Sequence, residues 1–229
     1  MKNRKKIVVF TGAGVSADSG ISTFRDSDGL WDKYRIEDVC TPEALARNRK
    51  TVIDFYNIRR RELLSKEPNA GHYAIRKLED HFDVEVVTQN IDGLHQAAGS
   101  RTVYELHGST LRNYCTRCGK FYDVDFIANS TGVPRCTECG GIVKPDVVLY
   151  EEGLDEEVLS GAVDAIRHAD TLIIGGTSLV VYPAAGLIRY FRGDNLVVIN
   201  MQPTGADASA DLCIAKPIGQ VLSEDISLD

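Results

Sequence analysis

The 229-residue sequence predicts an α/β fold built on a doubly wound parallel sheet, with a small metal-binding insertion. Short apolar runs bounded by turn residues recur along the chain, and segments of helical periodicity separate them. Most of these runs are apolar throughout, which is typical of parallel strands buried on both faces. One stretch with four cysteines, residues 115–141, interrupts the alternation and is interpreted as the insertion.

The expected strands and helices alternate in chain order, which is the pattern of a doubly wound sheet. The strand candidates are residues 7–10, 84–88, 147–150, 171–174 and 196–200, with a shorter one at 103–106. Helical patterns cover residues 43–66, 72–81 and 155–168.

The charge of the chain excludes some classes of function. The formal net charge is -7, so the protein is a poor candidate for gripping nucleic acid directly, which needs clustered Lys and Arg. No apolar run approaches the roughly 18 residues of a membrane span, and the run at 7–10 is too short for a signal peptide. We therefore expect a cytoplasmic protein without membrane contact, in which cysteines bind metal more often than they form disulfides.

A glycine-rich turn follows the first expected strand. Gly12, Gly14 and Ala17 match the G-x-G-x-x-G/A fingerprint, in which a tight turn and a helix N-terminus receive a pyrophosphate. The acidic residue expected about 20 positions later is missing, because residues 22–31 form a polar loop. This argues against hydride transfer and for a mobile loop beside a dinucleotide. A tight turn without any ligand is the alternative.

Four cysteines have the spacing of a structural zinc site. Two C-x-x-C pairs, separated by 17 residues, let four thiolates converge on one ion and leave no position for water. The predicted ligands are Cys115, Cys118, Cys136 and Cys139. Free or redox-active thiols are the alternative. Cys213 lies outside this pattern in an apolar context and is expected in the core.

Polar residues follow several expected strands at the edge where parallel sheets bind ligands. They are Gln89, Asn90 and Asp92 after 84–88, His107 after 103–106, Gly176, Thr177 and Ser178 after 171–174, and Asn200 at the end of 196–200. A histidine here can act as a general base near neutral pH. Ordinary turn chemistry is the alternative for the others, since Gly, Ser, Thr and Asn favour loops.

Taken in this order, these segments resemble the sirtuins, the NAD-dependent protein lysine deacylases. The resemblance covers about residues 7–218, and its matching stretches are 12–16, 19–21, 24–25, 88–95, 106–108, the four cysteines, 144–148, 176–179 and 183–185. It implies a Rossmann-like domain (1–33, 82–110 and 144–229), a helical insertion at 34–81 that contributes to the acyl-lysine pocket, and a zinc-binding module at 111–143.

The resemblance also implies roles for individual residues. The pyrophosphate would be held by Gly12, Ala13, Gly14 and Ala17, and the cofactor loop would contain Thr23, Phe24 and Arg25. The ribose and nicotinamide pocket would be lined by Gln89, Asn90, Ile91 and Asp92. The adenosine half would contact Gly176, Thr177, Ser178, Asn200 and Ile218. His107 would be the general base, with Asn90 as a second catalytic residue. A substrate peptide would lie as an extra strand against Val147, Val148 and Tyr150.

The reaction implied consumes NAD as a co-substrate. The acyl oxygen attacks the anomeric carbon of the nicotinamide ribose, nicotinamide leaves, and free lysine and O-acyl-ADP-ribose result. The partners implied are acylated lysines of proteins or peptides. The sequence has no heptad seam, and we expect a monomer. Mono-ADP-ribosyl transfer and a non-catalytic NAD-sensing module are the alternative functions.

Family members that take acidic acyl groups carry Tyr-x-x-Arg on a helix of the acyl pocket, and this chain has Tyr56 and Arg59 at that spacing. A phenol and a guanidinium fork bind a succinyl or malonyl carboxylate well. The alternative is that Tyr56 packs and Arg59 pairs with an acid such as Glu62. Two departures bear on this reading: Cys40 stands where those members have a small Ala, and Glu151 where the family often has Gly.

Overall fold

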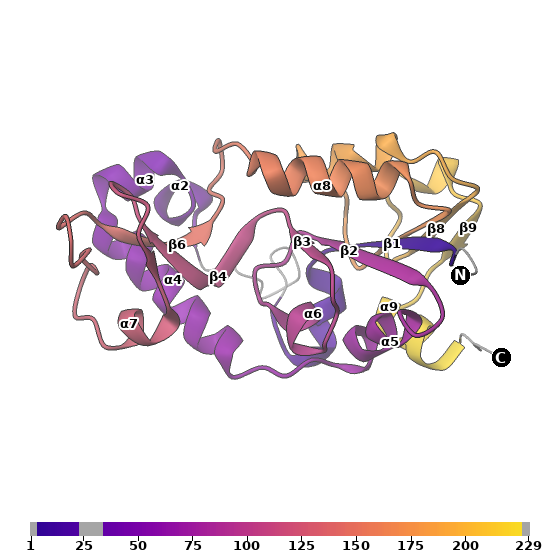
Figure 1. Ribbon diagram of the computed structural model, residues 1–229, viewed down its shortest axis with the longest axis horizontal. Coiled ribbons are helices and arrows are strands. Elements are labelled where there is room, and N and C mark those ends of the chain that lie inside the picture. The colour runs from indigo at the N-terminus through magenta and orange to yellow at the C-terminus, as the bar shows by residue number, and fades with distance from the viewer. Residues whose placement is uncertain (1–3, 23–33, 226–229) are drawn as a thin grey trace.

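The computed structural model of this chain describes residues 4–22 and 34–225, and its elements are drawn in Figure 1. Its larger sheet has six strands in the order β3-β2-β1-β7-β8-β9, and every neighbouring pair is parallel. The strands are β1 (Lys6–Thr11), β2 (Asp83–Thr88), β3 (Val103–Glu105), β7 (Thr171–Gly175), β8 (Asn195–Ile199) and β9 (Leu212–Ile214). The predicted doubly wound parallel sheet is confirmed.

Helices separate and follow these strands. The α-helices are α2 (Ile36–Val39), α3 (Pro42–Arg47), α4 (Arg49–Leu64), α5 (Ala70–Leu78), α6 (Leu94–Ala97), α7 (Val124–Ala128), α8 (Glu156–Arg167) and α9 (Ile218–Gln220). The 3₁₀ helices are η1 (Ala13–Ser19), η2 (Ala184–Tyr190) and η3 (Asp207–Ser209), and η4 (Val221–Asp225) is a π-helical turn. In the described part of the chain, no helix is both long and apolar enough to cross a bilayer.

Strand β1 feeds two apolar cores, because successive side chains of a strand point to opposite faces. Val8 and Phe10 pack with residues of α8 and η2, whereas Ile7 and Val9 pack with residues of α5 and α9. Figure 1 shows α8 on one side of the sheet and α5 and α9 on the other. Two layers of helices thus enclose the sheet, which explains why the run at 7–10 is apolar at every position.

A second, smaller sheet lies at the far end of the molecule (Figure 1). It is antiparallel, with the order β5-β4-β6, and its strands are β4 (Gly108–Cys115), β5 (Phe121–Tyr122) and β6 (Val143–Val147). Tyr122, Ile127 and Val143 form its own small core together with Cys115 and Cys136. Helices α2, α3 and α4 share another core with the end of β6.

Three expectations about local structure are wrong. The strand expected at 147–150 is mostly loop: β6 ends at Val147, and of the residues after it Leu149 is buried whereas Tyr150 is exposed. The helix expected at 43–66 is broken at Asn48, whose backbone (φ -140°, ψ 68°) is not helical and whose side chain caps α4. Cys213 is exposed rather than in the core, because β9 is an edge strand.

The predicted division into domains at residues 34, 82, 111 and 144 stays a prediction, and two contacts bear on its bounds. Helix α5, which precedes residue 82, contributes Ile75 and Leu78 to a core of the large sheet. Strand β6 begins at Val143 and pairs with β4, so the chain after the cysteines still belongs to the small sheet.

The order of strands in the large sheet reverses between β1 and β7. The chain leads from β1 to β2 and β3 on one side, and β7, β8 and β9 follow on the other. Crevices at such a switch point, beyond the carboxyl ends of the strands, are where open α/β sheets bind ligands.

Candidate active site

A cavity of about 510 Å³ opens at this switch point and continues towards the small sheet and α4. Every predicted cofactor, catalytic and acyl-lysine residue in the described part of the chain lines it. These are Gly12, Ala13, Gly14, Ala17, Tyr56, Arg59, Gln89, Asn90, Ile91, Asp92, His107, Val147, Val148, Tyr150, Gly176, Thr177, Ser178, Asn200 and Ile218. Thr23, Phe24 and Arg25 lie outside the described residues.

The glycine turn after β1 packs directly on the turn after β7. The N–H of Gly14 donates to the carbonyl of Gly176 at 2.8 Å. A Cβ on Gly14 would lie 2.7 Å from Gly176 Cα, and one on Gly12 would lie 2.7 Å from Thr177 Cβ. The two turns therefore form one tight backbone floor, which a side chain at Gly12 or Gly14 would push apart. A seven-residue 3₁₀ helix, η1, follows the turn where an α-helix start was expected.

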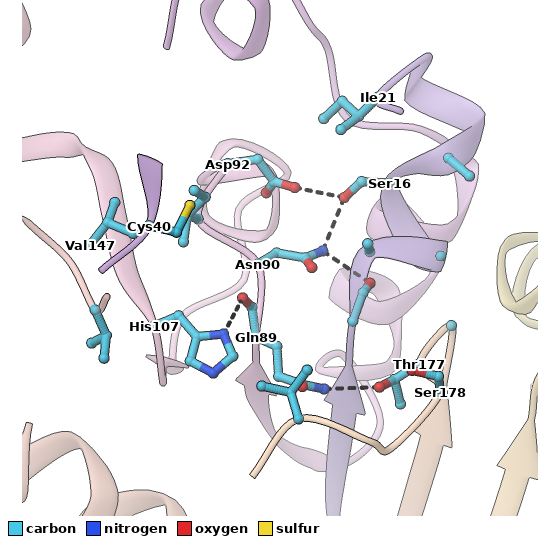
Figure 2. A pocket seen from close by; sticks show the side chains of 18 of the residues that line it. Ser16, Ile21, Cys40, Gln89, Asn90, Asp92, His107, Val147, Thr177 and Ser178 are labelled. Atoms are coloured by element: carbon cyan, nitrogen blue, oxygen red, sulfur yellow. Dashed lines mark hydrogen bonds between the residues drawn. The ribbon is translucent and has the colours of Figure 1, made fainter. Parts of the chain in front are cut away.

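A buried hydrogen-bond chain joins this turn to the tip of β2 (Figure 2). Asn90 Nδ2 donates to the carbonyl of Gly12 and to Ser16 Oγ, both at 3.1 Å, and Ser16 Oγ donates to Asp92 Oδ2 at 2.7 Å. Asn90 and Asp92 are 9% and 8% exposed. Both amide hydrogens of Asn90 are thereby used, which fixes its side-chain oxygen in one direction.

Ser16 and His72 were missed by the sequence reasoning. His72 Nε2 lies 3.4 Å from Ser16 Oγ, and its ring meets that of His95 edge to face with centroids 4.9 Å apart. Burial lowers the pKa of His72, and that of His95 to about 3, so both rings are neutral at neutral pH. Ser16 stands inside the glycine turn, so the sequence could have indicated it as a site residue. No such indication exists for His72, because its partners are distant in sequence.

The tips of β2 and β7 are joined in the same way. Gln89 Nε2 donates to Thr177 Oγ1 at 2.9 Å, and that oxygen also accepts from the N–H of Leu179. The polar residues expected at separate strand ends thus form one wall of the cavity (Figure 2).

His107 carries the most informative geometry of the site. Its Nδ1 lies 2.9 Å from the carbonyl oxygen of Gln89. A carbonyl can only accept, so this bond assigns the proton of the neutral ring to Nδ1 and leaves Nε2 without one. Burial lowers the pKa of His107 more than the Gln89 carbonyl raises it. The ring is therefore a neutral base at neutral pH, in the wall of the cavity.

The opposite end of the cavity is largely apolar. Tyr56 donates from its hydroxyl to Cys40 Sγ at 3.6 Å, and burial raises the pKa of the Cys40 thiol to about 11. Arg59 Nη1 lies 2.8 Å from Glu62 Oε2, and its Nη2 donates to the carbonyl of Ser22 at 3.4 Å. The pair of Arg59 with Glu62 is the one expected if Arg59 does not bind an acyl carboxylate. Tyr56 and Arg59 nevertheless both line the cavity.

The segment after β6 is tied to both sides of the cavity. The N–H of Val148 donates to the carbonyl of His107 at 3.1 Å, and that of Tyr150 donates to the carbonyl of Cys40 at 2.8 Å. Glu151 follows with φ +73°, a backbone conformation that favours glycine. The loop is thus held by main-chain bonds although it is not a strand.

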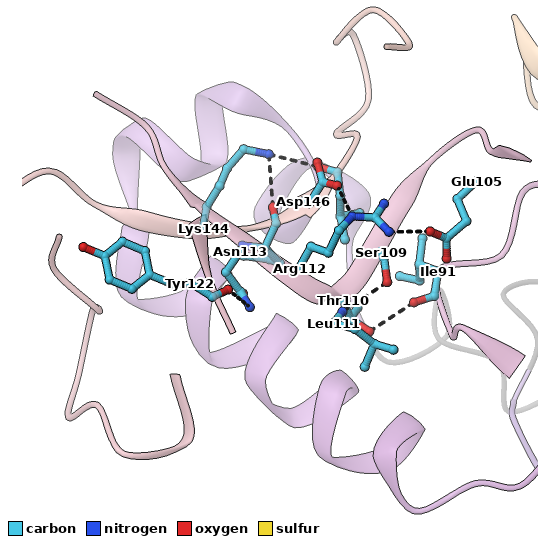
Figure 3. A network of polar contacts seen from close by, with 12 residues as sticks. Ile91, Glu105, Ser109, Thr110, Leu111, Arg112, Asn113, Tyr122, Lys144 and Asp146 are labelled. Atoms are coloured by element: carbon cyan, nitrogen blue, oxygen red, sulfur yellow. Dashed lines mark hydrogen bonds and ion pairs between the residues drawn. The ribbon is translucent and has the colours of Figure 1, made fainter. Parts of the chain in front are cut away.

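A network of charges supports the turn that carries His107 (Figure 3). Arg112 on β4 joins Glu105 at the end of β3 (2.6 Å) to Asp146 on β6 (2.9 Å). Lys144 Nζ donates to the carbonyl of Val147 at 3.0 Å. The large sheet, the small sheet and the segment that lines the cavity are therefore bonded together at one place.

The four predicted zinc ligands converge in the small sheet, their sulfur atoms all within 4.8 Å of one another. Their chemistry fits zinc, because four thiolates fill a tetrahedral site. The hydroxyl of Tyr122 donates to Cys136 Sγ at 3.1 Å and is the main reason why the pKa of that thiol falls to about 6. A thiol that ionises this readily is already suited to hold a metal ion.

Comparison with known proteins gives consistent results. A model of the Sir2 family matches residues 12–183. The NAD-dependent protein deacetylase of Clostridium perfringens (strain 13 / Type A) is 56% identical over 233 residues, which cover 99% of this chain and 95% of that protein.

Two solved structures add to this. A Sir2 homolog–NAD complex has a TM-score of 0.89 at 39% identity, covering 96% of this chain and 88% of that one. A Sir2 variant with a deacetylated p53 peptide and 3′-O-acetyl ADP-ribose has a TM-score of 0.84 at 34% identity, covering 99% and 96%.

Proposed function

This chain belongs to the Sir2 family, and from that premise we propose that it is an NAD-dependent protein lysine deacylase that removes acetyl groups. The observation that carries the proposal is His107, a neutral ring with its proton on Nδ1, set in the wall between the strand tips and the apolar end of the cavity. NAD is the co-substrate of this family, and the relative from Clostridium perfringens is named for the same reaction.

We assign the two ends of the cavity to the two substrates. The turns after β1 and β7, with Asn200 and Ile218, would hold the pyrophosphate and adenosine of NAD; Gln89, Asn90, Ile91 and Asp92 would hold its nicotinamide ribose. The acyl-lysine would enter past Val147, Val148 and Tyr150 and point its acyl group at Tyr56. We further assign to the cofactor loop Thr23, Phe24 and Arg25.

His107 would act as the general base. NAD, when bound, supplies the anomeric carbon that the acyl oxygen attacks as nicotinamide leaves. His107 Nε2 would take a proton from a ribose hydroxyl of the bound NAD, and with the uptake of one water the products would be nicotinamide, free lysine and O-acyl-ADP-ribose. The Gln89 carbonyl stabilises the imidazolium that forms, because it accepts from Nδ1–H throughout. Asn90, fixed by its two donated bonds, would keep its oxygen directed at NAD.

Acetyl-lysine is proposed as the first substrate and succinyl- or malonyl-lysine as the weaker ones. Tyr56 and Arg59 reach the cavity, which supports binding of an acidic acyl group. Both are engaged by other side chains, however, Tyr56 by Cys40 and Arg59 by Glu62. A neutral acyl group needs neither contact to be broken. We further propose that the enzyme acts as a monomer on acylated proteins.

Turnover of an acetyl-lysine peptide tests the proposal. We expect release of nicotinamide and O-acetyl-ADP-ribose, both dependent on the peptide, and a loss of about 10²-fold or more in kcat for His107→Ala. His168→Ala, which changes an exposed histidine at the end of α8, serves as the control. Nicotinamide release with ADP-ribose attached to protein would favour mono-ADP-ribosyl transfer, and NAD binding without any release would favour a sensor.

A further inference from the structure

Arg59 lies in the wall of the cavity with a carboxylate already bound to it. Its side chain is 6% exposed, whereas that of its partner Glu62, three residues further along α4, is 33% exposed. Arg59 and the neighbouring Tyr56 line the cavity, and Glu62 does not. The guanidinium is thus a buried, fixed part of the wall, and the carboxylate on it reaches in from the side of solvent.

A guanidinium fork is shaped to bind carboxylates, and here Glu62 of the protein itself supplies one. A substrate with an acidic acyl group would bring a second carboxylate to the same cation. With Glu62 in place the pair is neutral, so the complex would carry an uncompensated negative charge in a largely apolar pocket. Like charges brought together in this way lower affinity and create selectivity against the ligand that carries them.

We propose that Glu62 determines the acyl preference of this enzyme by occupying the carboxylate site of Arg59. Acetyl and other neutral acyl groups are accepted without disturbing the pair. Succinyl and malonyl groups bind only when the Glu62 side chain turns out to solvent, which its partial exposure permits. The inference rests on the proposed deacylase function and adds to it the residue that selects the substrate class.

The state of Tyr56 fits the same picture. Its hydroxyl donates to Cys40 Sγ within the protein, at a distance (3.6 Å) typical of a weak bond to sulfur. A carboxylate is a stronger acceptor than a thiol and would draw this donor away at little cost. Glu62 rather than Cys40 therefore determines whether an acidic acyl group binds, since the ion pair of Glu62 with Arg59 is the stronger of the two internal contacts.

The test compares two fluorescent peptides that differ only in carrying acetyl- or succinyl-lysine. Dissociation constants are measured by polarisation and kcat/KM with NAD, for the wild type, Glu62→Gln, and Glu62→Gln combined with Arg59→Met. Asp54→Asn is the matched control, because it removes another ion-paired carboxylate of α4, on Lys50, outside the cavity. Zinc content and melting temperature verify folding of each variant.

We expect Glu62→Gln to raise the succinyl-to-acetyl ratio about tenfold in both measurements, as for removal of a like charge from a partly buried pair. Asp54→Asn should leave the ratio unchanged, and Arg59→Met should abolish the gain. An unchanged ratio in Glu62→Gln, an equal rise in Asp54→Asn, or a gain that survives Arg59→Met would each overturn the inference. Absence of turnover would overturn only the proposed function, because the dissociation constants still decide the role of Glu62.

Discussion

At the scale of the residue, the fold keeps three buried or half-buried histidines in or beside the candidate site neutral. His107 is held in one tautomer by a single carbonyl, and His72 and His95 lie behind Ser16 and Thr11 in the interior. Buried imidazoles favour the neutral form, because the charged form loses its hydration. The same burial that keeps these rings neutral therefore makes the stability of the protein sensitive to acid.

His95 makes that sensitivity measurable. Its pKa is lowered to about 3, against about 6.5 for an unfolded histidine, so between these values the unfolded chain binds the extra proton. Stability rises with pH in this window: the contribution is complete above about 6.5 and is lost as pH falls towards 3, by up to about 1.4 kcal/mol per pH unit.

We therefore expect the free energy of unfolding to fall between pH 7 and pH 5, and to fall less steeply in His95→Gln. Urea denaturation at several pH values measures the two slopes. His168→Gln, at an exposed position, should keep the slope of the wild type. Equal slopes in all three proteins would contradict a neutral, buried His95.

At the scale of the element, helix caps connect local structure to the site. Asn69 caps α5 by accepting from the N–H groups of Gly71 and His72, and its amide donates to the carbonyl of Val15 (2.8 Å) and to Ser19 Oγ (3.0 Å) on η1. One side chain thus holds the start of α5 and the short helix that follows the glycine turn. Asn48 caps α4 with its oxygen alone and is exposed.

Replacing these two caps by alanine separates the two roles. Asn69→Ala should cost about 2–3 kcal/mol of stability and raise the KM for NAD, because a cap and two further bonds to η1 are lost. Asn48→Ala should cost about 1 kcal/mol, the usual contribution of a cap, and leave KM unchanged. Chemical denaturation and initial rates give both quantities, and equal effects of the two changes would refute the link to η1.

The strands and helices also show how much of the fold could be predicted from the sequence. The bounds of β1, β2, β7 and β8 were predicted to within one residue, because burial on both faces makes most of their residues apolar. The run at 147–150 is apolar for another reason: its side chains line the cavity and a core, while the N–H groups of Val148 and Tyr150 donate to carbonyls outside any strand. Hydrophobicity alone cannot separate these two cases, and neither could it detect the cap at Asn48 within a helical pattern.

The site was predictable to the extent that topology determined it. Polar residues at the ends of parallel strands must meet at one edge, so Gln89 and Thr177, far apart in sequence, were placed correctly together. The ion pair of Arg59 with Glu62 could be stated only as an alternative, since spacing on a helix permits it without requiring it. His72 could not be found, because only the folded chain brings it to Ser16.

At the scale of the whole molecule, two sheets with separate cores share one cavity. The small sheet is too small to fold on apolar burial alone, so a metal ion bound by its four cysteines would contribute directly to its folding. Arg112 on its strand β4 in turn pairs with Glu105 of the large sheet and with Asp146 on β6 (Figure 3). Loss of the metal should therefore reach the active site.

Cys136→Ser tests this coupling. We expect loss of zinc, a melting temperature lower by about 10 °C, and a loss of deacylation, because an incomplete tetrahedral site gives up binding energy coupled to folding. Metal analysis, calorimetry and peptide turnover measure the three effects. Cys213→Ser is the control, since that thiol is exposed and outside the cluster. Normal zinc content and melting temperature in Cys136→Ser would refute a structural metal site.

The bond from the Val148 N–H to the carbonyl of His107 has a consequence for anyone who sets out to evolve this enzyme. The residue that we propose to contact the peptide and the residue that we propose as the base share one main-chain hydrogen bond, so a library that reshapes the groove would also perturb the base. Selection for new peptide sequences should therefore return clones with altered pH optima. Variation at Tyr56, Arg59 and Glu62, which lie on α4 apart from this link, offers a route to new acyl groups that leaves proton transfer alone.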